Sequence, residues 1–136
     1  MTKVTKYTWN EFEQDVRKMS MFMVGQKFDV IFAVVKGGLP LGVKLANMYN
    51  LPLRIIQVNK SQGHIEVVSP PEGLTPTMKV LIVDDISDSG KTLRDVLGHF
   101  HGGNVRTLTI HYKSGSITKP DFFVRKATNW VQYPWE

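Results

Sequence analysis

Residues 80–92, with the sequence VLIVDDISDSGKT, hold the densest group of side chains that could do chemistry. Four apolar residues are followed at once by Asp84 and Asp85, and small polar residues then lead into a helix. Adjacent carboxylates can accept hydrogen bonds from hydroxyls and hold a hard cation such as Mg²⁺. Main-chain N–H groups at a loop and helix N-terminus, with Ser and Thr hydroxyls, bind phosphate. A ribose phosphate carries both kinds of group, so the segment predicts a site for such a ligand.

Two other interpretations of this segment fit it less well. Gly90-Lys91-Thr92 resembles the end of a P-loop, but that motif requires glycine where Asp85 stands, and a carboxylate there would repel a phosphate. Acids that only cap a helix would explain one carboxylate, but they would not explain an adjacent pair followed by Asp88. We therefore interpret the segment as a sugar-phosphate site.

A second candidate site is Lys36-Gly37-Gly38, which directly follows an apolar run at 29–35. A cation followed by two glycines at a strand end allows consecutive N–H groups to converge on an anion. The same residues also suit an ordinary strand-to-helix turn. In the C-terminal part, Lys113 follows an apolar segment and Trp130 lies in a short tail, and the residues alone favour a solvated lysine and a core tryptophan.

The elements that must position these residues follow from capping, periodicity and turn signals. The first expected helix runs from the Thr8 capping box to about Gly25, with Phe12, Val16, Met19 and Met23 inward. The second has Pro40 in its first turn and Leu41, Leu45 and Met48 inward, and the third spans 92–100 and is ended by Gly102-Gly103. The expected strands are 29–35, 53–58, 79–83, 105–112 and 121–124, and 60–78 should be a long loop with a hairpin at 65–68. Alternating helices and strands predict an α/β fold with a mainly parallel sheet flanked by helices, as a single domain over 1–136.

Composition narrows the class of protein. The 136 residues contain no cysteine, which excludes disulfides, thiolate nucleophiles and cysteine-ligated metal sites. No apolar run approaches the roughly 20 residues that span a bilayer, and the first seven residues are polar, so we expect a cytoplasmic protein without a membrane partner. Seventeen basic against twelve acidic residues, a net charge of +5, suit an anionic ligand, but a solvated basic surface would look the same.

With these residues in place, the chain resembles the type I phosphoribosyltransferases. Residues 80–92 are similar to the family's signature for phosphoribosyl pyrophosphate (PRPP), and the similarity extends to Thr8-Trp9-Asn10, 31–47, Lys113 and 129–136. Within the family the chain is most similar to the xanthine-guanine enzymes. The resemblance implies a type I phosphoribosyltransferase-like fold with a small hood built from the chain ends.

The resemblance also implies a role for each matching residue. Asp84 and Asp85 would hold the ribose hydroxyls and, through Asp85, a Mg²⁺ ion. The 5-phosphate loop would consist of Ser87, Asp88, Ser89, Gly90, Lys91 and Thr92, with Asp88 as the catalytic group that exchanges a proton with the purine imidazole. Pyrophosphate would bind Lys36, Gly37 and Gly38, after a peptide bond that is often cis in the family. Base binding would fall to Lys113 at the 6-oxo group, Trp130 by stacking, and the main chain of Val131.

The sequence departs from the family at two places. Many purine members carry Ser-Tyr in a mobile loop, whereas 59–78 lacks that pair, and Lys60 or His64 are candidates for a pyrophosphate contact there. Gln132 stands where the xanthine-guanine enzymes carry an acid. We read His99, His101 and His111 as structural or surface residues.

The expected function is transfer of a phosphoribosyl group from PRPP to a 6-oxopurine, in purine salvage, with Mg²⁺ as cofactor. The partners are then PRPP and the nucleobase, with no nucleic acid. The alternatives are a pyrimidine or nicotinamide substrate, a regulatory protein that binds PRPP without transfer, and a nucleic-acid-binding module. Only a few residues, up to Glu136, follow the expected base site. We therefore expect a homo-oligomer, a dimer or tetramer, in which the partner subunit completes the pocket.

Overall fold

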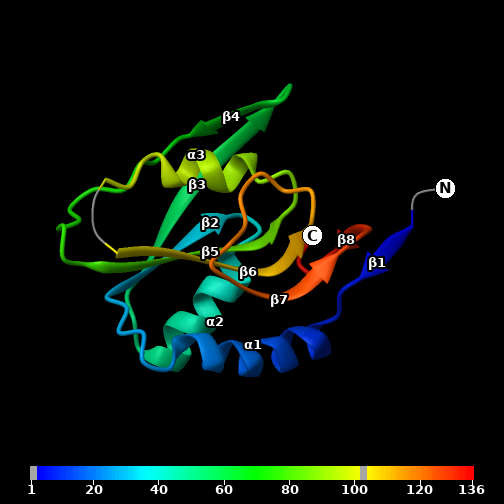
Figure 1. The fold of residues 1–136 in the computed structure, drawn as a ribbon, viewed down its shortest axis with the longest axis horizontal. Coiled ribbons are helices and arrows are strands. Elements are labelled where there is room, and N and C mark those ends of the chain that lie inside the picture. The colour runs from blue at the N-terminus through cyan, green and yellow to red at the C-terminus, as the bar shows by residue number, and fades with distance from the viewer. Residues whose placement is uncertain (1–2, 102–103) are drawn as a thin grey trace.

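The computed structural model describes residues 3–101 and 104–136. Its main sheet has six strands in the order β4-β3-β2-β5-β6-β7, and every neighbouring pair is parallel except β3 and β4. These strands are β2 (Val30–Val35), β3 (Leu53–Ser61), β4 (His64–Val67), β5 (Lys79–Ser87), β6 (Asn104–Lys113) and β7 (Phe122–Ala127). Helices α1 (Trp9–Met23) and α2 (Leu39–Tyr49) cover one face, and α3 (Lys91–Leu97) covers the other (Figure 1). The predicted α/β fold is confirmed.

The central strands are buried on both faces because alternate side chains enter two separate clusters. Ile31 and Ala33 of β2 pack in the cluster that contains α1 and α2, whereas Phe32 packs in the cluster that contains α3. Strand β5 repeats the pattern, with Leu81 on the first side and Ile82 on the second. Burial on both faces accounts for near-continuous apolar runs in place of alternation.

The two longer helices begin where the sequence predicts. Thr8 Oγ1 accepts a hydrogen bond from the Glu11 N–H, and the Glu11 carboxylate accepts one from the Thr8 N–H, both at 3.1 Å, so the capping box before α1 is formed. The side chains expected to point inward from α1 are all buried, namely Phe12, Val16, Met19 and Met23. In α2 the inward position of Met48 is wrong, because this residue is 46% exposed. The buried stripe of α2 runs through Leu41, Gly42, Leu45 and Ala46 instead.

The predicted boundaries around the carboxylate pair are also wrong. Strand β5 does not end at residue 83 but continues to Ser87, and Asp84 and Ser87 pair with Thr109 and Tyr112 of β6. The carboxylates are therefore part of the strand. Helix α3 ends at Leu97 instead of residue 100, and the proposed glycine stop at 102–103 lies outside the described residues.

The loop expected from residue 60 is shorter than predicted. Strand β3 continues to Ser61 and pairs with β4 across a turn at Gln62-Gly63. A hairpin is therefore present, but not at 65–68 as predicted, because residues 64–67 form only its second strand. Both turn residues have positive φ, 49° for Gln62 and 77° for Gly63. The irregular segment begins only after β4.

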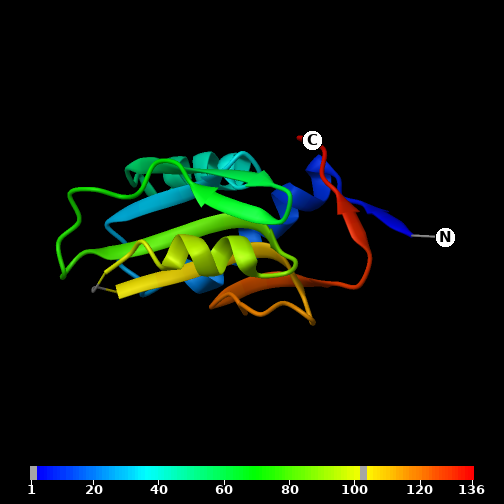
Figure 2. The same cartoon turned by 90° about the horizontal axis from the view of Figure 1, so that it is seen from above.

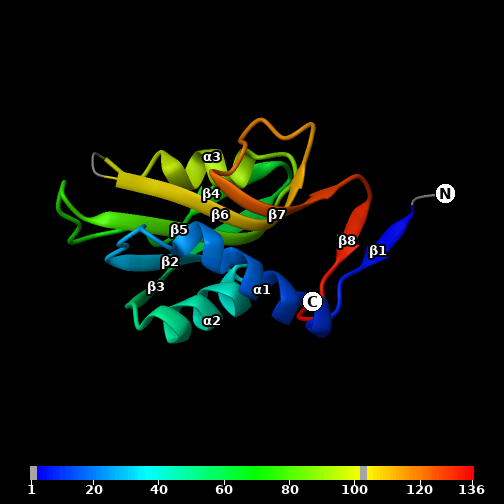
Figure 3. The ribbon, with the colours of Figure 1, turned by 60° about the horizontal axis from the view of Figure 1, so that its bottom comes forward.

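A two-stranded parallel sheet joins the ends of the chain. Strand β1 (Val4–Lys6) pairs with β8 (Trp130–Gln132) in the register Val4 to Trp130, outside the main sheet (Figures 2 and 3). The expected hood is confirmed, and the short tail forms strand β8 because β1 supplies its partner. None of the helices in the described ranges is long and apolar enough to cross a bilayer.

Candidate active site

A cavity of about 560 Å³ lies at the carboxyl ends of β2, β3 and β5, next to the hood. Open α/β sheets bind ligands at this edge. The wall includes most of the residues predicted from the sequence: Lys36, Gly37, Asp84, Asp85, Ser87, Asp88, Ser89, Gly90, Thr92, Trp130 and Val131. Gly38, Lys91 and Lys113 are not part of this wall. The fold thus brings together three segments that the sequence separates by tens of residues.

The carboxylate pair is the electrostatic centre of the cavity. Asp84 is 8% exposed and accepts a hydrogen bond at 2.8 Å from the main-chain N–H of Asp85. Burial, and then the charge of Asp85, raise the pKa of Asp84 well above its ordinary value. Burial also raises the pKa of Asp85, although hydrogen bonds from its neighbours lower it. The pair therefore has more negative charge than its surroundings compensate, which favours a cation or hydroxyl donors.

The space beside Asp85 is kept open by a glycine. A Cβ on Gly37 would lie 2.5 Å from Asp85 Oδ2. Across the described ranges, no group of three or more His, Asp or Glu could hold a metal by itself. Two carboxylates with open space suit Mg²⁺, which keeps several waters and takes oxygens from its substrate. The donor set fits that ion on condition that water and ligand complete its coordination.

Gly38 has a packing role and does not face the cavity. A Cβ there would lie 2.5 Å from the Val83 carbonyl oxygen and 2.8 Å from that of Val34. The Gly38 N–H also donates to the Val34 carbonyl at 2.8 Å. This glycine lets the chain turn tightly over the ends of β2 and β5 and places Lys36 in the cavity wall. The peptide bond between Val35 and Lys36 is cis, as the family resemblance implies.

The phosphate loop is supported by a segment far away in sequence. The Ser87 hydroxyl is buried, donates to the Thr118 carbonyl at 2.7 Å and lies 2.8 Å from Ser116 Oγ. Gly90 has φ of 87°, and a Cβ there would lie 2.5 Å from the Thr118 nitrogen. The family resemblance places Ser87 and Gly90 in the 5-phosphate loop. In the structure both residues contact 116–118 and so hold the loop in place.

The side of the cavity that is predicted to bind the base is built from separate side chains. Lys113 Nζ, at the end of β6, lies 3.3 Å from Asp88 Oδ1, so the two predicted polar residues meet. Trp130 is 57% exposed, which rules out a core tryptophan, whereas Val131 is 6% exposed and packs into the core. The Trp130 ring and the Asp88–Lys113 ion pair are therefore both exposed enough to meet a ligand.

Several residues in the wall were not predicted. Tyr133 and Glu136 come from the tail, and Asn59 comes from the end of β3. Lys60, considered only as a possible contact, does line the cavity, whereas His64 lies in the hairpin opposite Ser61. The carboxyl end of β3 could have been found from the rule that parallel strand ends meet, but nothing in the tail signals its position.

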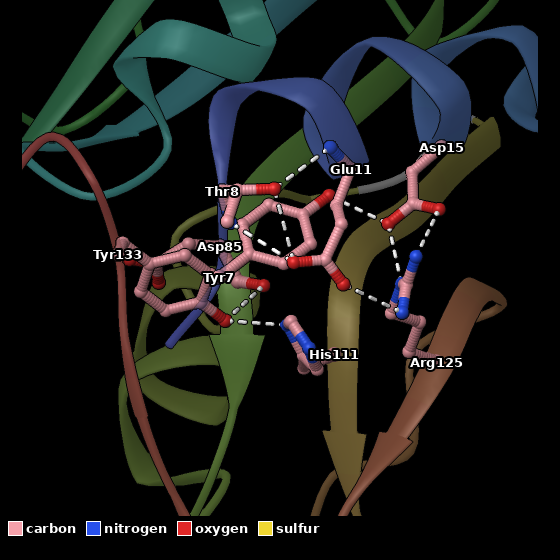
Figure 4. Close-up of polar contacts among 8 residues, drawn as sticks. All are labelled: Tyr7, Thr8, Glu11, Asp15, Asp85, His111, Arg125 and Tyr133. Carbon is pink, nitrogen blue, oxygen red and sulfur yellow. Dashed lines mark hydrogen bonds and ion pairs between the residues drawn. The ribbon is translucent and has the colours of Figure 1, made fainter. Parts of the chain in front are cut away.

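A buried ionic network attaches the hood to α1. Asp15 is fully buried and accepts hydrogen bonds from Tyr7 Oη at 2.6 Å and from Arg125 Nε at 2.7 Å (Figure 4). Arg125 also lies 3.2 Å from Glu11. Burial, and then the hydrogen bond to Asp15, raise the pKa of Tyr7. These contacts place β1, and with it β8, over the end of the sheet.

A carboxylate pair on a central strand, a phosphate loop after it and a hood from the chain ends define the type I phosphoribosyltransferase architecture. The family model described as "Phosphoribosyl transferase domain" matches residues 6–135. The chain belongs to the phosphoribosyltransferase family.

Known proteins similar to this chain come from diverse organisms. The xanthine-guanine phosphoribosyltransferase of Chromohalobacter salexigens is 26% identical over 142 residues, covering 95% of this chain and 82% of that protein. The crystal structure of a purine phosphoribosyltransferase from Pyrococcus horikoshii is 28% identical, with a TM-score of 0.92, and covers 98% of this chain and 94% of the other. The Helicobacter pylori xanthine-guanine-hypoxanthine enzyme shares the fold at 21% identity, with a TM-score of 0.88 over 98% of this chain and 94% of its own.

Proposed function

We propose that this protein transfers the 5-phosphoribosyl group of PRPP to a 6-oxopurine (guanine, hypoxanthine or xanthine) and releases pyrophosphate, as a step of purine salvage. The observation that carries the proposal is one cavity whose wall runs from the buried Asp84-Asp85 pair to Asp88 and the exposed Trp130. Lys113, outside that wall, forms an ion pair with Asp88. The names of the xanthine-guanine and purine enzymes to which the chain is similar support a purine base.

The two substrates divide the cavity between them. The main chain of the loop after β5 would bind the 5-phosphate, and Asp84 and Asp85 would accept hydrogen bonds from the ribose hydroxyls. Lys36 and the N–H groups around it would bind pyrophosphate. A Mg²⁺ ion held by Asp85 would supply charge stabilisation for the leaving pyrophosphate. Fixing the sugar in this way places its anomeric carbon in line with the base.

The reaction needs one proton acceptor on the base side. A ring nitrogen of the purine forms a bond to the anomeric carbon while the bond from that carbon to the pyrophosphate oxygen breaks. The proton on the purine imidazole passes to the Asp88 carboxylate, which its half-exposed position leaves accessible. The base would displace the Lys113 ammonium from Asp88, and the ammonium would then donate a hydrogen bond to the 6-oxo group of the base.

Lys113 would determine the choice of base. An ammonium donates hydrogen bonds and accepts none, so it favours a 6-carbonyl over the 6-amino group of adenine. A wrong hydrogen-bonding group in a buried site costs large factors in kcat/KM, and we expect guanine to exceed adenine by about a hundredfold or more. Gln132, exposed on β8, makes xanthine the least secure of the three substrates.

Two experiments test the proposal. A panel of nucleobases with PRPP and Mg²⁺, followed by mass detection of the nucleotide, should show guanine or hypoxanthine products. Efficient use of adenine, or of uracil or nicotinamide alone, would overturn the base assignment.

Calorimetry should show that Asp85→Ala weakens Mg²⁺-dependent PRPP binding by more than about tenfold, because a charge beside the metal is lost. Equal affinity in the two proteins would overturn the PRPP site.

The Lys36 loop has a separate test. Lys36→Ala should slow transfer because the leaving pyrophosphate loses a cation, while affinity for ribose 5-phosphate, which lacks pyrophosphate, should stay nearly unchanged. A parallel loss of transfer rate and of ribose 5-phosphate affinity would mean that Lys36 has only a structural role.

The proposal includes three accompanying predictions: dependence on Mg²⁺, a cytoplasmic location, and a homo-oligomer without nucleic-acid or membrane partners. A regulatory protein that binds PRPP without transfer is the second candidate, favoured by the missing Ser-Tyr in 59–78. The pairing of Asp88 with Lys113 favours the enzyme, because PRPP binding alone requires neither a proton acceptor nor a base contact.

A further inference from the structure

The tail after β8 returns to the carboxylate strand through Tyr133. This side chain is 3% exposed, and its hydroxyl donates to the main-chain carbonyl of Asp85 at 3.2 Å. The same hydroxyl lies 2.8 Å from Nδ1 of His111 on β6 (Figure 4). A residue at the end of the chain thus bonds to the backbone of the central catalytic segment.

Proton counting gives these two bonds a direction. A phenol has one proton, and in this geometry Tyr133 gives it to Asp85, so His111 must donate its Nδ1–H to the Tyr133 oxygen. Burial, and then the charge of Arg125, lower the pKa of His111 to about 4, so the ring is neutral near pH 7 and carries one N–H. The bonds form a single series from His111 through Tyr133 to the Asp85 carbonyl.

Ring packing fixes the position of the Tyr133 hydroxyl. The Tyr133 ring stacks on Trp135 with centroids 4.9 Å apart at 14°. The Tyr7 ring meets it edge-on at 5.5 Å and 72°. A phenol held between two rings has little freedom, so its hydroxyl can set the position of the carbonyl to which it donates.

Trp135 presents a second donor near the same residue. Its indole N–H is buried and, within the part of the chain that the structure describes, has no partner in hydrogen-bond geometry. Trp135 and Asp85 line one cavity of about 930 Å³, which adjoins Lys36 and Gly37. Burying an unpaired donor is unfavourable. The Asp85 carboxylate would accept a hydrogen bond from the indole N–H if it is ionised or if it shifts when ligand binds.

We propose that Tyr133 and Trp135 are positioning residues for Asp85: the phenol holds its main-chain carbonyl, and the indole N–H orients its carboxylate. The tail of the hood then sets the direction in which Asp85 meets its ligand. The inference rests on the proposed function in one respect, that the ligand is PRPP. It goes beyond that function because neither residue touches the reacting atoms.

Paired variants test this role. Tyr133→Phe and Trp135→Phe each remove one donor and keep an aromatic ring, and each should weaken calorimetric PRPP affinity in Mg²⁺ by about tenfold. Tyr49→Phe in α2, which lines neither of the two cavities, is the matched control and should leave that affinity unchanged. Steady-state kinetics should show that KM for PRPP rises more than KM for the base. A raised base KM with unchanged PRPP affinity would mean that the tail only supports the hood, and would overturn the proposal.

A measurement without substrate separates this proposal from the proposed function. The ¹⁵N–¹H indole resonance of Trp135, assigned with Trp135→Phe, should move in Asp85→Asn because the facing charge is removed. An unmoved resonance would overturn the role of Trp135, whether or not the protein binds PRPP. If the wild type fails to bind PRPP but the resonance moves, the proposed function fails and the contact to Asp85 stands. Should Tyr133→Phe not fold, Trp135→Phe and this resonance decide the outcome.

Discussion

The two halves of the cavity are built in different ways. The half proposed to bind phosphate and pyrophosphate, termed the phosphate half, is formed by the segments 36–38 and 84–92 at strand ends, whose main chain is held by the sheet. The half proposed to bind the base, termed the hood half, is formed by Trp130 and Val131 of β8 and by Tyr133 of the tail, with Lys113 of β6 paired to Asp88. In the phosphate half the critical contacts are backbone distances, such as that of Gly38 to Val83. In the hood half they are a surface ring, an ion pair and a buried phenol.

This difference predicts opposite responses to substitution. A change in the phosphate half that adds a carbon against main-chain atoms should disturb the sheet and so affect stability. A change in the hood half should alter one substrate's affinity and leave the fold intact, because its side chains are replaceable one at a time. His111 and Tyr133 connect the halves and should show both effects.

The largest expected effect is that of Gly38→Ala. The added Cβ would lie within 3 Å of two carbonyl oxygens and the Cα of Asp84, which are main-chain atoms that cannot move independently. We expect a loss of about 3 kcal/mol or more in the free energy of unfolding, measured with urea. Gly63→Ala, in a hairpin turn with open space around it, is the comparison and should cost less. Equal costs would show that the tight turn over β2 and β5 is not a constraint.

The next effect is acid destabilisation through His111. Its pKa is about 4 in the folded protein and about 6.5 unfolded, so the unfolded state binds more protons between these values. Stability should fall as pH is lowered from about 6.5 to 4, by at most about 3 kcal/mol. Melting temperature against pH measures it. His111→Phe should be less stable at pH 7, because Tyr133 loses a donor. Its melting temperature should depend less on pH between about 4 and 6.5 than that of the wild type. Parallel curves for the two proteins would contradict this prediction.

Gly37→Ala should separate function from stability within the phosphate half. Its Cβ meets the end of the Asp85 side chain, which can rotate away, so the fold should lose little. The displaced carboxylate should weaken PRPP binding by about tenfold, which calorimetry measures. A protein that unfolds like Gly38→Ala would show that both glycines serve packing.

The smallest effect is expected for Trp130→Leu in the hood half. At 57% exposure the indole contributes little to the core, so the melting temperature should change by no more than about two degrees. Loss of stacking, worth about 0.5–1.5 kcal/mol, should raise KM for the base by about two- to tenfold and leave PRPP affinity unchanged. A parallel loss of PRPP affinity would show that the halves are not separable.

Much of the phosphate half could be predicted because local sequence dictates it. The apolar runs at 29–35 and 79–83 mark buried strands, and the charged and glycine residues after them fall where parallel strands end. The prediction went wrong at the boundary, where β5 continues through Asp84 and Asp85 to Ser87. Pairing with β6 decided that boundary, and no local preference of aspartate signals it.

What the sequence determined by itself is the α/β pattern, the capping box of α1, and the two segments that carry the carboxylates and the lysine loop, since each depends on residues adjacent in the chain. Only the tertiary structure decided that 116–118 supports the phosphate loop, that Lys113 meets Asp88, and that Tyr133 reaches Asp85. These contacts join residues 25 or more positions apart. Their energies depend on how the sheet, the hood and α1 pack together, and that packing is a property of the whole chain.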